Sequence, residues 1–132
     1  MSQTLAKPVL NKVGYLIVYV DDMHMAVSFY KEKLGLAPKF EDKEWTELET
    51  QGFTLALHAS KKAPAIDKEN GPCIVFSVED IKGTHAALKE QGLAVSELKT
   101  VCEHDGMIGL SGDFADPSGN RLSVYGMVKK TV

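Results

Sequence analysis

The chain has 132 residues, of which 44% are hydrophobic and 25% are charged, so it can fold around a sizeable core as one domain. A net charge of −3 and a pI near 5.8 argue against nucleic-acid binding, because phosphate contacts need a dense basic surface. No apolar run reaches the ~18–20 residues that span a bilayer, and the N-terminal residues lack a signal-peptide layout, so we expect a cytoplasmic protein.

The first half of the chain predicts a strand, a helix and three shorter strands. Residues 12–20 are rich in β-branched and aromatic side chains, which is typical of a buried strand. Asp22 can cap a helix over about 23–34, where apolar residues recur at helical spacing. Strands are then expected at about 36–41, 45–49 and 53–58.

The second half repeats this order after a stretch without periodicity. Residues 59–70 carry charge and a proline, which predicts a linker. A strand at 73–78 and a helix at 81–90 follow. The remaining strands are expected at about 94–101, 107–115 and 120–126.

Short segments of the two halves match at a nearly constant offset. Residues 20–23 (VDDM) resemble residues 78–81 (VEDI) 58 positions later, and residues 34–36 (LGL) resemble residues 91–93 (QGL) 57 positions later. We therefore expect one domain over residues 1–132, built from a module at about 12–60 and a second at about 71–127. Two unrelated strand–helix pairs of similar length remain the alternative.

Three segments carry a resemblance to a known family: VGYLIVYVDDMHMAVSFYKEKLGL, its weaker echo PCIVFSVEDIKGTHAALKEQGL, and the closing FADPSGNRLSVYG. Together they resemble the glyoxalase/bleomycin-resistance/extradiol-dioxygenase (vicinal oxygen chelate) superfamily over about residues 12–127. The resemblance implies an α+β fold of tandem βαβββ modules that form a curled mixed sheet around a cleft, usually completed in a homodimer. Lyases, isomerases, dioxygenases, thiol transferases and binding proteins share this fold, so it leaves the function open.

The resemblance also implies four strand positions at which metal-dependent members hold a ligand, and these fall here at Tyr15, Ala56, Cys73 and Ser123. Ala56 has no donor atom, neutral serine is a poor ligand, and tyrosine would have to ionise from a pKa of about 10. We therefore expect that the family metal site is lost and that the chain has no cofactor.

A displaced metal site is the alternative. His58 shares a strand face with Ala56 and could act with Cys73 and either Glu49 or Asp113. We favour an ordinary polar role for His58 at the rim of the cleft. The other histidines (His24, His85 and His104) are expected on helix surfaces or in a loop, exposed to solvent.

Strand alternation predicts which side chains face the cleft. The opposite faces are more uniformly aliphatic and are expected to pack on the helices. The tyrosines could instead fill the interior of the sheet, and Cys73 is either a nucleophile or, as we favour, a small buried apolar residue. Trp45 could stack on a ligand or lie at a dimer contact, and the sequence does not decide. The predicted ligand-binding residues are Tyr15, Tyr19, His58, Cys73, Asp113, Arg121, Ser123 and Tyr125.

These residues favour metal-free binding of a small, partly aromatic molecule in a tyrosine-lined cleft, in a cytoplasmic homodimer. One alternative is a lyase, isomerase or dioxygenase that uses a displaced metal site or the acid–base groups of His58, Cys73 and Asp113. Another is a subunit whose pocket is vestigial and whose role is association.

Overall fold

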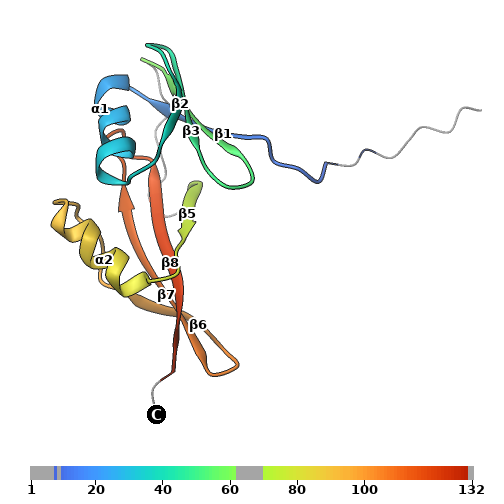
Figure 1. Ribbon diagram of the computed structural model, residues 1–132, viewed down its shortest axis with the longest axis vertical. Helices are drawn as coiled ribbons and strands as arrows, with labels where there is room; N and C mark the ends of the chain where they lie inside the picture. The colour runs from blue at the N-terminus through green and yellow to red at the C-terminus, as the bar shows by residue number, and fades with distance from the viewer. Residues whose placement is uncertain (1–7, 9, 62–69, 131–132) are drawn as a thin grey trace, which may run out of the picture.

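The computed structural model describes residue 8 and residues 10–61 and 70–130, which form two modules of the same layout (Figure 1). The first module consists of β1 (Tyr15–Val20), α1 (Met23–Ser28), the π-helical turn η1 (Phe29–Lys33), β2 (Pro38–Glu41), β3 (Trp45–Glu49) and β4 (Thr54–Ala59). The second consists of β5 (Cys73–Ser77), α2 (Ile81–Glu90), β6 (Lys99–His104), β7 (Met107–Ala115) and β8 (Arg121–Lys129). The expected α+β fold of tandem βαβββ modules is confirmed. Most of the expected linker, residues 62–69, lies outside the described residues.

The two four-stranded sheets repeat both strand order and register. The orders are β1-β4-β3-β2 and β5-β8-β7-β6, and the first two strands of each are parallel while the other pairs are antiparallel. Tyr15 lies opposite Thr54 in the first sheet, and Cys73 lies opposite Arg121 in the second. Equivalent positions of the two modules can therefore be compared residue by residue.

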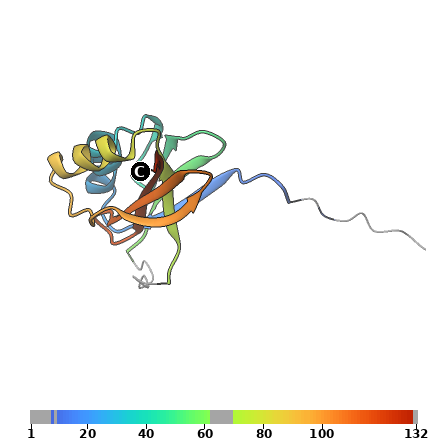
Figure 2. The same ribbon diagram turned by 90° about the horizontal axis from the view of Figure 1, so that it is seen from below.

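Both helices lie on the same side of the molecule, as two perpendicular views agree (Figures 1 and 2). The aliphatic strand faces predicted to pack there are buried and belong to one continuous core that spans both modules. Their most buried members are Val20, Leu55, Leu57, Leu122 and Val124. No helix of the described residues covers the opposite faces of the two sheets, and these faces hold the predicted ligand-binding residues.

The Asp-Pro-Ser-Gly-Asn turn fastens the two modules together. The buried Asp116 carboxylate accepts hydrogen bonds from the backbone N–H groups of Ser118 and Asn120, at 2.9 and 2.8 Å, and from the Asn120 amide at 2.8 Å. It also accepts the hydroxyl of Tyr30, from the first module, at 2.7 Å. Asn120 in addition donates to the Tyr19 carbonyl at 3.0 Å. The most recognisable motif therefore has a structural role, because its Asp carboxylate accepts four hydrogen bonds within the chain.

Three predicted boundaries were wrong in the second module, including the end of the strand expected at 94–101, which lies at His104. The strand expected at 94–101 begins only at Lys99, because Ser96 exchanges hydrogen bonds with Asp113 (its N–H donates at 2.9 Å and its Oγ accepts at 2.9 Å), so that this segment runs along β7 as a loop. The final strand, expected to end at residue 126, runs on to Lys129, which pairs with Met107.

His85 was expected to be solvated, but it is 8% exposed. Its Nε2 lies 2.8 Å from the Ser96 carbonyl, so the ring links α2 to the loop before β6. The predicted helix at 23–34 changes from α- to π-helical geometry at Phe29.

Candidate functional site

The structure divides the predicted ligand-binding residues between two sheet faces. Tyr15, Tyr19 and His58 lie on the first sheet, and the others lie on the second: Cys73, Asp113, Arg121, Ser123 and Tyr125. We call the first surface the aromatic face and define it by Tyr15, Ile17, Tyr19, Trp45, Glu47 and His58. We call the second the polar face and define it by Cys73, Lys99, Ser111, Asp113, Arg121, Ser123 and Tyr125.

Strand register brings four rings together on the aromatic face. Tyr19, His58 and Trp45 are cross-strand neighbours on β1, β4 and β3. The His58 ring centroid lies 5.4 Å from that of Tyr19 and 5.6 Å from that of Trp45. The Trp45 ring also lies 6.3 Å from Tyr15, which is four residues along β1 from Tyr19. Because Ala56 occupies the middle of β4 with only a methyl group, the indole has room to extend along the sheet.

The indole of Trp45 is held in place by a carboxylate. Its Nε1–H donates to Glu47 Oε2 at 2.9 Å, and both residues point from β3 to the same side because they are two residues apart. Such a bond fixes the ring orientation before any ligand arrives, which reduces the entropy lost on binding.

The aromatic face is open to solvent. The exposed fractions are 55% for Tyr15, 41% for Ile17 and 43% for Tyr19, so these side chains do not fill a core. Contiguous exposed apolar patches often mark interaction sites in proteins, so the aromatic face is a candidate binding surface.

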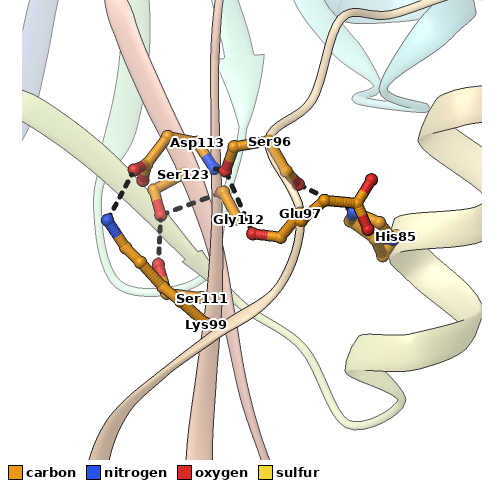
Figure 3. A network of polar contacts seen from close by, with 8 residues as sticks. All are labelled: His85, Ser96, Glu97, Lys99, Ser111, Gly112, Asp113 and Ser123. Carbon is orange, nitrogen blue, oxygen red and sulfur yellow. Dashed lines mark hydrogen bonds and ion pairs between the residues drawn. The ribbon is translucent and has the colours of Figure 1, made fainter.

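The polar face is hydrogen-bonded within itself (Figure 3). Ser123 is 3% exposed; its hydroxyl donates to the Gly112 carbonyl at 3.1 Å and lies 3.0 Å from the hydroxyl of Ser111, which is therefore the donor of that second bond. Lys99 and Asp113 form an ion pair at 3.3 Å. These groups already have partners, whereas the rings of the aromatic face present free surface.

Other groups of the polar face are also engaged. Arg121 donates to the Gly71 carbonyl. The hydroxyl of Tyr125 lies 2.9 Å from Met127 Sδ and 3.3 Å from Cys102 Sγ, and its hydrogen bond to Cys102 raises the pKa of Tyr125. Partial burial raises the pKa of the Cys73 thiol, an effect that Arg121 opposes. Cys73 is therefore a weaker nucleophile near neutral pH than an ordinary thiol.

The family metal site does not fit the residues present. Ala56 is fully buried and has no donor, and the Ser123 hydroxyl is committed to Gly112 and Ser111. Tyr15 and Cys73 would both have to ionise before they could act as ligands. Within the described ranges, no group of three or more His, Cys, Asp or Glu side chains is placed to hold a metal ion, so the displaced site at His58 and Cys73 is not assembled in a single chain.

Sequence reasoning left Trp45 undecided and omitted Glu47. The alternation of β3 could have indicated both residues. Trp45, Glu47 and Glu49 lie on one side of the strand, and the buried Thr46 and Leu48 lie on the other side. The side of β3 that carries these long side chains is the side that belongs to the aromatic face.

A separate hollow of about 570 Å³ lies between the first helix and the β2–β3 hairpin. Lys31 and Lys43 line it together with Glu32, Glu41 and Asp42, over a floor of Met23, Val27 and Thr46. Because its rim carries charges of both signs, the hollow favours neither an anionic nor a cationic ligand. This hollow is the alternative location for a ligand-binding site.

The fold and the site positions define the class of this protein. A family model described as the Glyoxalase/Bleomycin resistance protein/Dioxygenase superfamily matches residues 12–124, and the chain belongs to this superfamily. Along the described residues, no helix is long and apolar enough to cross a membrane.

Individual proteins that resemble this chain share a third or less of its sequence. The uncharacterized protein YetH of Bacillus subtilis (strain 168) is 31% identical over 90 residues, covering 64% of this chain and 75% of YetH. TnmS3, described as an antibiotic binding protein from Streptomyces sp. CB03234, has a similar fold with a TM-score of 0.74 at 21% identity, covering 92% of this chain and 100% of TnmS3. A glyoxalase/bleomycin resistance protein/dioxygenase from Alicyclobacillus acidocaldarius gives a TM-score of 0.72 at 22% identity, covering 88% and 91% of the two chains.

Proposed function

We propose that this protein binds a small, partly aromatic molecule on the aromatic face, without a metal ion. The observation that carries the proposal is the open array of rings, in which Tyr15 and Tyr19 are about half exposed and the Trp45 indole is fixed by Glu47. Flat aromatic molecules gain both apolar burial and ring stacking on such a surface. The antibiotic-binding role given for TnmS3 supports the same class of function on a similar fold.

We further propose a homodimer in which a second copy covers the aromatic face. A single chain leaves Ile17, Tyr19 and, on the second sheet, Val75 (54% exposed) in water. A second copy would bury these side chains and turn an open face into a cleft that surrounds the ligand. A reducing cytoplasm suits the two free thiols, Cys73 and Cys102.

Binding is favoured over catalysis by the state of the candidate acid–base groups. Asp113 is paired with Lys99, His58 packs between two rings, and burial disfavours the thiolate of Cys73. General acid–base catalysis needs such groups within hydrogen-bond reach of one another or of one substrate atom. The residues that define the aromatic face offer ring surface to a ligand, but they include no pair of acid–base groups hydrogen-bonded to each other.

The proposal is tested with a thermal-shift panel of neutral and charged planar aromatic compounds, each with and without divalent cations. A true ligand at 100 times its dissociation constant stabilises the fold by ~2.7 kcal/mol. Because Trp45 is the only tryptophan, ligand contact should also change the intrinsic fluorescence. We expect stabilisation without added metal, and its loss in Trp45→Ala but not in the matched polar-face variant Tyr125→Phe.

Two results would contradict the proposal. Stabilisation that requires a divalent cation and depends on His58 would indicate the displaced metal site. A panel without any effect, combined with a stable dimer, would favour a role in association alone.

A further inference from the structure

The proposed ligand surface carries a carboxylate at its centre. Glu47 is half-buried on β3, directly opposite Ala56, which in turn lies opposite Ile17. This row lies between the row that holds Trp45 and Tyr19 and the row that holds Tyr15. The indole N–H occupies one carboxylate oxygen and leaves the other available to a ligand on the same face.

Glu47 has no basic partner among the described residues, whose ion pairs all involve other groups. Lys39 reaches this side of the first sheet, where it donates to Thr54 at 2.6 Å and shares a shallow hollow with Glu49. The charge of Lys39 is therefore held away from the row of Trp45 and His58 and lies beside a second carboxylate. The centre of the face is left negative.

Ring faces and a carboxylate attract the same kind of ligand. The π faces of tryptophan and tyrosine carry negative potential and bind cations, most strongly when water is excluded. Glu47 adds a full negative charge beside them, so an anionic ligand would be repelled and a cation attracted. We infer that the ligand is an organic cation whose positive charge lies on or next to a planar aromatic ring, such as an N-alkylated or protonated heteroaromatic amine. This inference rests on the proposed function and adds the charge of the ligand and the residue that selects it.

The test compares 1-methylquinolinium chloride with quinoline, which has the same ring system and is neutral at pH 7.5. Dissociation constants are measured by titrating the Trp45 indole N–H resonance of ¹⁵N-labelled protein. We expect the cation to bind the wild type about tenfold tighter than quinoline, as cation–π and charge contacts of this kind predict. Added salt should weaken binding of the cation and leave quinoline unaffected.

Glu47→Gln keeps an acceptor for the indole but removes the charge, so it should reduce the preference for the cation to about twofold while quinoline binds as before. The matched control is Glu90→Gln at the exposed end of α2, which should preserve the wild-type preference. Equal binding of both compounds, or a preference that survives Glu47→Gln, would overturn the inference but leave the proposed function standing. Failure of both compounds to bind at the indole would overturn the inference and remove the aromatic face from the proposed function as well.

Discussion

The two modules have the same strand order and the same register, yet their helix-free faces differ in kind. At equivalent places on the first strand of each sheet, the first module presents the exposed rings of Tyr15 and Tyr19, and the second presents the half-buried Cys73 and the exposed Ser77. On the first sheet the aromatic side chains meet one another and water. On the second, hydroxyl and charged groups satisfy each other through hydrogen bonds and an ion pair.

Under the proposed function, this difference assigns ligand binding to one module and a structural role to the equivalent face of the other. The shared parts (strand order, helix position and the aliphatic core) hold the chain together in both modules. The polar face has become part of that framework, because buried polar groups stabilise a fold when they are paired. The aromatic face has not, and a surface that does little for folding is free to bind a ligand.

The largest loss of stability is expected at the joint between the modules, where Asp116 of the second module binds Tyr30 of the first. Asp116→Ala removes the acceptor of four hydrogen bonds, including that of the buried Tyr30 hydroxyl, so we expect the free energy of unfolding to fall by about 3 kcal/mol. Tyr30→Phe should cost about 1.5 kcal/mol. The matched control, Tyr19→Phe, alters an exposed ring and should change the free energy of unfolding by less than about 0.5 kcal/mol. Urea denaturation measures all three, and equal effects of the two tyrosine variants would contradict this account of the joint.

A change on the aromatic face should affect binding and leave folding intact. Trp45→Ala removes the ring that contacts both Tyr15 and His58, so the affinity for quinoline should fall about tenfold or more, equivalent to about 1.4 kcal/mol. Calorimetric titration measures this without the lost fluorophore. Tyr125→Phe on the polar face should stay within about twofold of the wild type. A larger loss in Tyr125→Phe than in Trp45→Ala would reverse the comparison between the faces.

A change at Ser123 on the polar face should affect folding and leave ligand binding intact. Ser123→Ala leaves the Gly112 carbonyl without its donor and the hydroxyl of Ser111 without its acceptor, so we expect a loss of about 1 kcal/mol in the free energy of unfolding. Quinoline affinity should be unchanged. Ser77→Ala, at an exposed position of the same sheet, is the control and should have almost no effect on stability. Loss of ligand affinity in Ser123→Ala at normal stability would place the ligand on the polar face.

The smallest expected effect is a difference in thiol reactivity. Because burial raises the pKa of Cys73, less of it is thiolate at pH 7.5, and it should be alkylated by iodoacetamide more slowly than the exposed Cys102. The variants Cys102→Ser and Cys73→Ser allow each thiol to be measured alone. As the pH rises, the rate at Cys73 should continue to increase above the ordinary pKa of a thiol. Faster reaction at Cys73 would revive the nucleophile hypothesis.

Most of the fold could be predicted from the sequence, because strand alternation and helical spacing are local signals. The boundary at Lys99 could not, since it depends on Ser96 bonding to Asp113, 17 residues away. His85 was assigned to solvent although it shares a helix face with Ile81 and Leu88, at spacings of four and three residues, and all three are buried.

The candidate site was predictable only in part. The sequence placed Tyr15, Tyr19 and His58 on one helix-free face, but their exposure depends on how the two sheets are arranged. Ser123 was expected to be available to a ligand, but its hydroxyl is hydrogen-bonded to that of Ser111, a contact that forms only once β7 and β8 pair. Glu47 is part of the candidate site because it accepts a hydrogen bond from the Trp45 indole. The charge of Glu47 alone does not predict this contact.

Chemical-shift mapping of ¹⁵N-labelled protein during a quinoline titration can show whether the proposed ligand binds on the aromatic face. We expect the resonances of the Trp45 indole N–H and of the backbone amides of β1 and β4 to shift together and to saturate at one dissociation constant. Shifts confined to β7 and β8, or to the hollow between α1 and the β2–β3 hairpin, with the indole resonance unmoved, would contradict this expectation.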